Sequence, residues 1–199
     1  MTPPPSVPTL VALTVWRLLV AGVALTGFLA ATARFGGDAW QGLSQLASLV
    51  AAVVYLALAA YPATVGFRRH EPRSSWVRGA TLVVLLLVGG SWFALLGGAV
   101  DTTWSLLEHL VTPLLVLADY LVVGRGQRES RWWHPLTWLL PPLAYLAFYY
   151  AAGLDIYGFL DPSSSAFVPT LAGMLVGVLA LGYVLVGYGV LRRSQHDLR

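Results

Sequence analysis

The residues best suited to chemistry in this chain are three ionisable side chains inside one strongly apolar segment, Trp104 to Val123. They are Glu108, His109 and Asp119. An ionisable group in a membrane-spanning helix is costly and normally faces protein or a watery cavity. An imidazole can take the proton of a hydroxyl group and later return it to a leaving group, which is the minimum for nucleophilic catalysis. The segment therefore predicts a polar site that needs a hydroxyl at the same depth.

A second polar stripe, in residues 40–61, supplies such a hydroxyl. Its polar residues recur at near-heptad spacing: Gln41, Ser44, Gln45, Ser48 and Tyr55. At 1.5 Å per residue, Ser44 and His109 each lie roughly 6 to 9 Å below the outer membrane boundary, so they can meet. The segment that holds the histidine carries two neighbouring polar stripes: Thr102, Ser105, His109 and Thr112 on one, and Asp101, Glu108 and Asp119 on the other.

Three interpretations of these stripes stay open on spacing alone. Ser44 and His109 can form a catalytic dyad, the polar residues can simply hold two helices together, or they can line a path for an ion or substrate. Serine in a membrane helix commonly bonds a backbone carbonyl or a neighbouring helix, and a single histidine commonly packs as a hydrogen-bond donor. Pro113 removes a backbone donor and its ring conflicts with the carbonyl of His109, so we expect a kink at the histidine.

The elements that must position these residues are membrane spans. Hydrophobic residues make up 57% of the 199 positions and charged residues 11%, and the apolar residues form blocks long enough to cross a bilayer. We expect one integral membrane domain over residues 1–199, an all-α, polytopic six-transmembrane-helix bundle. The predicted spans are 9–32, 40–61, 76–99, 103–123, 133–154 and 166–191.

The charges predict how this bundle sits in a cell membrane. All twelve basic residues are arginine, and ten of them follow the second, fourth or sixth span: Arg68, Arg69, Arg73, Arg78, Arg125, Arg128, Arg131, Arg192, Arg193 and Arg199. The positive-inside rule then places both termini in the cytoplasm. The net charge of +3 is thus a topology signal, and no nucleic-acid surface is expected. Arg17 and Asp119 lie at similar depths and are predicted to form a structural ion pair.

The chain has too few suitable residues for cysteine chemistry, a zinc site or a haem site. The chain has no cysteine, which excludes disulfides, thiolate metal sites and cysteine nucleophiles. A zinc site needs three or four convergent ligands, and a bis-histidine haem needs two histidines inside the membrane. We therefore expect no metal and no cofactor. In the last span, Gly173 and Gly177 form a small-xxx-small step that favours close helix packing and can serve an oligomer.

Three short stretches together resemble a known family. They are Trp40-Gln-Gly-Leu-Ser44, then Glu108-His109-Leu-Val-Thr-Pro113 with Asp119 further on, then Gly153-Leu-Asp-Ile-Tyr157-Gly-Phe159-Leu-Asp161. This order resembles the androgen-induced and androgen-dependent membrane hydrolases and their six-helix bacterial relatives. The resemblance implies a multipass threonine-type hydrolase that cleaves fatty-acid esters of hydroxy fatty acids. It places the family's essential threonine on Ser44 and its essential histidine on His109.

The chain departs from the family pattern at three points. Ser44 replaces the threonine but keeps the hydroxyl, the proline lies four residues after His109 where the animal proteins have it at five, and Gly158 follows Tyr157 in place of proline.

These observations predict a lipid-ester hydrolase whose pocket opens to the outer leaflet, with Ser44 and His109 catalytic. The competing interpretation is a non-catalytic lipid-binding or scaffold protein. The loop from Asp155 to Asp161 is expected to fold over the pocket as a lid, or to rest with its aromatic rings at the headgroup level. Residues expected to support the site are Gln41, Gln45, Ser48, Thr102, Ser105, Glu108, Thr112, Tyr157 and Phe159.

Overall fold

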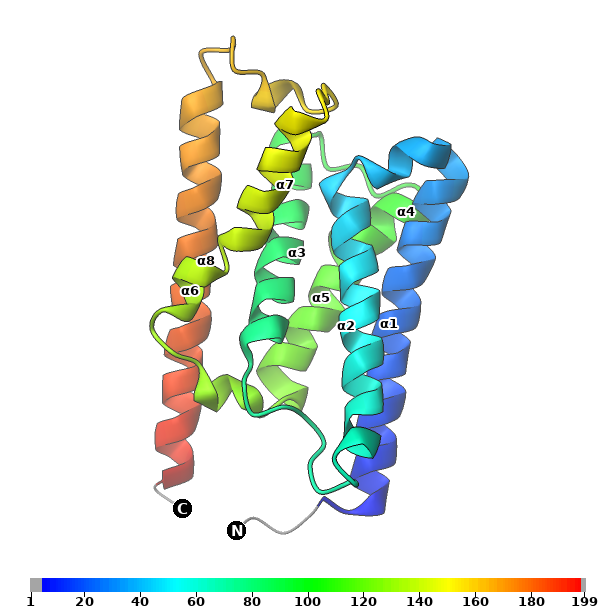
Figure 1. Ribbon diagram of the computed structural model, residues 1–199, viewed down its shortest axis with the longest axis vertical. Coiled ribbons are helices and arrows are strands. Elements are labelled where there is room, and N and C mark those ends of the chain that lie inside the picture. Colours follow the sequence, from blue (N-terminus) through cyan, green and yellow to red (C-terminus); the bar gives the residue numbers. More distant parts are fainter. Residues whose placement is uncertain (1–4, 198–199) are drawn as a thin grey trace.

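The computed structural model describes residues 5–197, and all regular structure within them is helical (Figure 1). Five helical stretches are long and apolar enough to cross a membrane: 7–40, 43–64, 76–95, 103–123 and 167–194. The first contains α1 (Val7–Phe35) and η1 (Gly36–Trp40), and the next two are α2 (Leu43–Thr64) and α3 (Trp76–Leu95). The fourth joins α4 (Thr103–Leu106), η2 (Leu107–Val111), α5 (Thr112–Ala118) and η3 (Asp119–Val123), and the fifth lies in α8 (Phe167–Asp197).

The predicted span 133–154 is not one continuous helix. It consists of α6 (His134–Thr137) and α7 (Leu140–Ala151), separated by a turn at Trp138 and Leu139. The break falls just before Pro141 and Pro142, because proline lacks the N–H that would continue a preceding helix but is tolerated in the first turn of a new one. The twelve residues of α7 rise only about 18 Å, less than the hydrocarbon core of a bilayer. In Figure 1 this broken segment lies beside α8.

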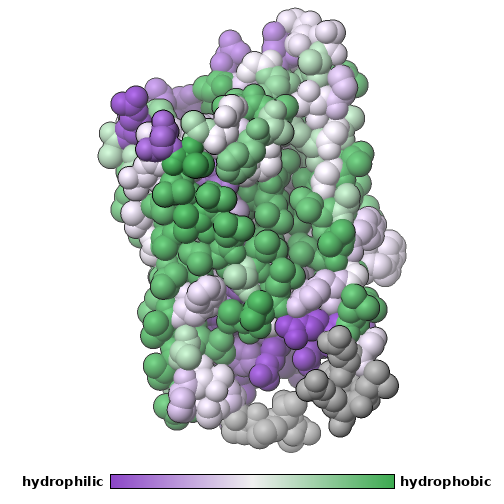
Figure 2. All heavy atoms as spheres, turned by 180° about the vertical axis from the view of Figure 1, so that it is seen from behind, coloured by the Kyte–Doolittle hydropathy of each residue, from purple (hydrophilic) through white to green (hydrophobic). Residues whose placement is uncertain are grey.

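The surface of the bundle suits a membrane environment. Many large hydrophobic side chains point outward, among them Val15 and Leu29 on α1 and Val176 and Val184 on α8. Figure 2 shows hydrophobic residues over the middle of one face and hydrophilic ones gathered toward the two ends. The start of α1 and the end of α8 lie at the same end of the bundle (Figure 1). Together these features are those of a helical multipass membrane protein.

A buried charge network at that end replaces the predicted ion pair between Arg17 and Asp119. Arg17 pairs with Glu71 at 3.4 Å, and Asp119 pairs with Arg78 at 3.2 Å. Arg78 also contacts Glu71, at 2.5 Å, so the four residues form one network within the described part of the chain. The prediction was wrong about the partners because the polar turn after α2, which reads as a solvated loop, folds inward and supplies a second buried carboxylate.

The carboxylate of Asp119 also accepts hydrogen bonds from two uncharged side chains. Trp16 Nε1 and Tyr55 Oη each donate to its carboxylate, both at 3.0 Å. Asp119 and Arg17 are fully buried, so these contacts replace the water that both charges would otherwise require. The network ties α1, α2, α3 and η3 together.

The expected distortion at His109 takes the form of a π-helical turn, η2, which contains His109 and ends at Val111, two residues before Pro113. The N–H of Thr112 bonds the carbonyl of Leu107, five residues back. The freed carbonyl of His109 packs against α3 at Gly89, where an added Cβ would stand only 2.8 Å from that oxygen. Gly89 thus lets α3 approach the helix that carries the histidine.

We predict that Gly89→Ala destabilises the protein while Gly90→Ala does not. At Gly89 the new methyl group must push the His109 carbonyl away, whereas at Gly90, on the exposed side, nothing lies within 4 Å. Overpacking of this kind costs about 1 to 3 kcal/mol. Thermal unfolding of both variants in the same detergent would measure it, and equal melting temperatures would contradict the close approach.

Candidate functional site

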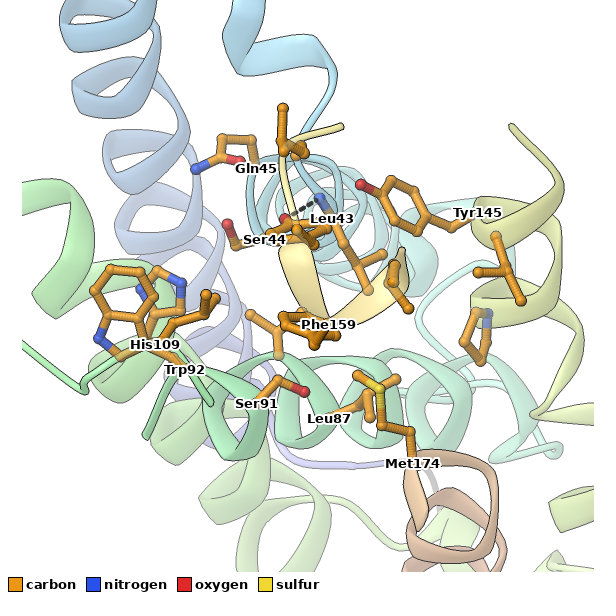
Figure 3. Close-up of a pocket in the computed structure, with 18 of the residues that line it drawn as sticks. Leu43, Ser44, Gln45, Leu87, Ser91, Trp92, His109, Tyr145, Phe159 and Met174 are labelled. Carbon is orange, nitrogen blue, oxygen red and sulfur yellow. Dashed lines mark hydrogen bonds between the residues drawn. The ribbon is translucent and has the colours of Figure 1, made fainter. Parts of the chain in front are cut away.

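One cavity of about 330 Å³ brings Ser44 and His109 to the same space (Figure 3). Its walls come from the start of α2, the end of α3, α7, the loop before α8, and α8 itself. The walls are mainly apolar and aromatic, including Trp92, Tyr145 and Phe159. The volume lies within the range of small-molecule sites, and the chemistry of the walls suits a hydrocarbon chain.

Ser44 is the second residue of α2, and its side chain is only 7% exposed. It also lines the cavity. Its hydroxyl lies beside the carboxyl group of Glu108, next to Gln45 and Ser48. Ser44 and His109 line one cavity, yet no hydrogen bond joins them in this part of the chain.

His109 is held by a backbone contact and two indole rings. Its Nδ1 lies 3.0 Å from the carbonyl oxygen of Ser105. Because a carbonyl only accepts, Nδ1 must carry the hydrogen, and in the neutral ring Nε2 then keeps a free lone pair. The imidazole stacks on Trp92 at 4.1 Å and meets the edge of Trp104 at 5.7 Å. These contacts fix the ring with a basic nitrogen still available.

Glu108 is the most unusual polar residue of the site. It is fully buried, and its Oε2 accepts a hydrogen bond of 2.8 Å from Gln45 Nε2, while Oε1 has no partner in the described structure. None of the ion pairs among those residues includes Glu108. Gly27 of α1 packs against it, with an added Cβ only 3.1 Å from Glu108 Cγ. A carboxyl group is therefore enclosed without a compensating cation.

Several residues expected to support the site lie outside the cavity wall. Thr102 and Ser105 bond each other in a capping box that begins α4. The side chain of Gln41 donates to Asp38, although its carbonyl accepts from Tyr145 Oη. Two further hydroxyls are fully buried without a partner in the described chain, and neither lines the cavity: Ser48 and Thr112.

The loop between α7 and α8 packs against the cavity. Tyr157 and Phe159 line it, and Tyr157 Oη accepts a hydrogen bond from Leu43 N at 3.2 Å, the dashed line in Figure 3. The Tyr157 ring stacks between Tyr149 at 5.9 Å and Phe159 at 5.4 Å. Burial raises the pKa of the Tyr157 phenol, so the group keeps its proton. The loop thereby caps the helix end that carries Ser44.

The sequence patterns did not single out Trp92, Tyr145 or Met174 as cavity residues. Each lies on a helix that reads as an ordinary apolar span, so only the packing of α3, α7 and α8 brings them to the site. No group of three or more His, Cys, Asp or Glu side chains gathers as a metal site within the described chain. Comparison with protein-family models, curated proteins and solved structures gives no match.

We predict that Glu108→Gln preserves or raises stability, whereas Glu108→Leu lowers it. Glutamine removes an uncompensated buried acid and keeps an acceptor for Gln45, while leucine leaves the Gln45 amide buried without a partner. The leucine variant should lose about 1 to 3 kcal/mol in thermal unfolding. Glu129→Gln, at an exposed acid, is the control. Equal losses for both Glu108 variants would show that the fold requires a charged carboxylate.

Proposed function

We propose that this protein hydrolyses a lipid ester in the cavity, with Ser44 as nucleophile and His109 as acid–base residue. The observation that carries the proposal is that the serine hydroxyl and the histidine line one apolar cavity. The Nδ1 contact to Ser105 supports it further, because it leaves Nε2 as the basic nitrogen. The resemblance of the Ser44 and His109 stretches to the androgen-induced hydrolases points to the same chemistry.

In the proposed reaction Ser44 Oγ bonds to the ester carbonyl carbon as its proton passes to His109 Nε2. When the tetrahedral intermediate collapses, the bond to the alcohol oxygen breaks and His109 returns the proton to that oxygen. Water then attacks the acyl-serine, with His109 again as base, and releases a fatty acid. The Ser44 side chain must turn from Glu108 toward the cavity, a rotamer change that is fast on the timescale of turnover.

A second apolar space favours a lipid as the substrate. A groove of about 350 Å³ lies between α2, α3 and α7, and shares Leu43 and Tyr145 with the main cavity. Its walls include Val50, Val77 and Phe148, all at least partly exposed on the outer surface. Because the two spaces adjoin at Leu43 and Tyr145, the groove is the proposed sideways entry for a hydrocarbon chain from the membrane.

A non-catalytic lipid-binding protein is the second candidate. It is favoured by the missing hydrogen bond between Ser44 and His109 and by the position of the Ser44 hydroxyl beside Glu108. In that case the cavity holds a lipid, and the polar residues only join α2 to the helix that carries His109.

Turnover separates these candidates. Ser44→Ala and His109→Ala should each reduce hydrolysis of a long-chain ester by about a thousandfold, since each removes one member of the acid–base pair. Ser91→Ala is the matched control, because Ser91 lines the same cavity from α3. A fluorophosphonate probe should label wild type and Ser91→Ala but not Ser44→Ala. No turnover and no labelling in folded wild type would favour the lipid-binding protein.

The loop before α8 should affect catalysis without affecting folding. Tyr157→Phe removes the acceptor of the Leu43 N–H, and Phe159→Ala widens the cavity beside Ser44, so both should lower kcat/KM about tenfold through lost orientation. Tyr183→Phe, on the outer surface of α8, is the control. Full activity of both loop variants would remove the loop from the mechanism.

We also propose that the chain crosses the cell membrane six times, with the broken α6–α7 segment as the fifth crossing and both termini cytoplasmic. The arginine distribution supports this orientation, as does the common position of the start of α1 and the end of α8 (Figure 1). A topology reporter fused after Arg199 should read as cytoplasmic, and one inserted at Ser164 as external. The reverse pattern would place the cavity in the inner leaflet.

A further inference from the structure

A cluster of polar side chains around Glu108 is enclosed between helices. Glu108 lies on the π-helical turn η2, and Gly27 of α1 packs directly against it. From α2, the side chains of Ser44, Gln45 and Ser48 lie beside its carboxyl group. Figure 3 shows the first two of these at the start of α2. All four polar residues are buried, so bulk water does not solvate the carboxyl group.

Three side-chain oxygen atoms in this region have no hydrogen-bond partner among the described residues. They are Glu108 Oε1, Ser48 Oγ and Thr112 Oγ1, and all three residues are completely buried. Thr112 follows Glu108 by four residues, about one helical turn, so its side chain lies on the same face of the helix. Buried polar groups that lack protein partners are commonly satisfied by an ordered water molecule or an ion. A set of three such oxygens is typical of a binding site.

The backbone of the same turn contributes a fourth oxygen atom. In a regular α-helix the carbonyl of Glu108 would accept a hydrogen bond from the N–H of Thr112, four residues later. Here that N–H bonds the carbonyl of Leu107, and the next residue, Pro113, has no N–H to offer. The Glu108 carbonyl therefore lacks both of these helical donors. Carbonyls freed at interruptions of membrane helices are known ligands of cations.

The charge and chemistry of these groups favour a monovalent cation. Carboxylate, hydroxyl and carbonyl oxygens are the ligands that hard cations prefer. The ion pairs among the described residues all lie elsewhere, so no arginine there neutralises Glu108. A buried acid without a counter-charge in a membrane helix is costly and marks a functional site. One carboxylate balances one positive charge, and no group of three or more His, Cys, Asp or Glu side chains gathers in the described chain to hold a divalent ion.

The packing around Glu108 is tight, which favours a small cation. At Gly27 an added Cβ would stand only 3.1 Å from Glu108 Cγ, so α1 leaves little room beside the carboxyl group. Glu108, Ser48 and Thr112 border neither the main cavity nor the lateral groove. Selectivity between cations follows the size of the site and the number of its ligands. Sodium is smaller than potassium and therefore fits this enclosed set of oxygens better.

We infer that Glu108, Ser48 and Thr112 form a sodium site inside the bundle. Its ligands are Glu108 Oε1, the two hydroxyls and the Glu108 carbonyl. The Gln45 amide donates to Glu108 Oε2 at 2.8 Å and so holds the carboxylate in place with Oε1 left for the ion. The bound ion supplies the counter-charge and joins α2 to the helix that carries Glu108. The site goes beyond the proposed hydrolysis and does not depend on it, because its three residues lie outside the cavity wall.

Thermal unfolding in two salts tests the site. At constant ionic strength, replacing potassium chloride with saturating sodium chloride should raise the melting temperature of wild type by roughly 5 °C, because the ion binds the folded state. Glu108→Gln should unfold no earlier than wild type in potassium chloride and should gain nothing from sodium, whereas Glu129→Gln, at an exposed acid, should keep the full gain. Equal melting temperatures of wild type in the two salts, at both neutral and alkaline pH, would assign the oxygens to a proton or water and overturn the inference.

Thr112 offers a matched pair of variants for a direct binding measurement. Thr112→Val removes the hydroxyl but keeps the shape of the side chain, whereas Thr112→Ser keeps the hydroxyl. Purified protein should bind radiolabelled sodium with an affinity about tenfold lower in Thr112→Val than in Thr112→Ser. Ser48→Ala should weaken binding to a similar extent, and Ser91→Ala, in the cavity wall, should not. Equal affinities in the two Thr112 variants, or displacement of the label by potassium as readily as by unlabelled sodium, would also overturn the inference.

Discussion

The structure depends on one constraint: in an apolar environment such as a membrane, a polar group must form its hydrogen bonds or ion pairs within the protein. Within the five long apolar helical stretches, most backbone N–H and C=O groups bond to each other. The buried polar side chains and the groups at the helix ends must each find a separate hydrogen-bond or ion-pair partner. The bundle meets this constraint differently at its two ends. That difference separates the part that holds the fold together from the part that is suited to a ligand.

At the end where α1 starts and α8 ends, the matching is dense. Asp119 forms an ion pair with Arg78 and accepts hydrogen bonds from Trp16 and Tyr55. Arg17 forms an ion pair with Glu71 and donates a hydrogen bond to the carbonyl of Leu58. The charged groups and hydrogen-bond donors there come from α1, α2, α3 and the turn after α2. Removing any one of these side chains therefore leaves several buried polar groups without their partners. A network of this kind fixes the register of the helices, although Arg17 Nε is buried in it without a hydrogen-bond partner among the described residues.

At the cavity end, polar atoms lack partners within the described residues. Glu108 Oε1 and the hydroxyls of Ser48 and Thr112 are all buried there. Unmatched polar groups are expensive, and proteins keep them where a substrate, a water molecule or a proton transfer supplies the missing partner. The interruption between α6 and α7 contributes to the same end, because α7 borders both the main cavity and the lateral groove through Tyr145.

The sequence by itself determined the helical class, five of the apolar spans and the two polar stripes, because hydrophobic length and helical period are local properties of the chain. It also indicated the distortion at His109, since Pro113 acts on its own helix. The α6–α7 break was readable from Pro141 and Pro142, but the apolar run around them outweighed that signal. Partner choice was decided only by tertiary structure: Glu71 folds in from a polar turn and takes Arg17, and Ser44 lies beside Glu108 and has no bond to His109. Depth along a span follows from counting residues, whereas the direction of a side chain depends on how each helix is rotated against its neighbours, and that rotation is set by packing across the whole bundle.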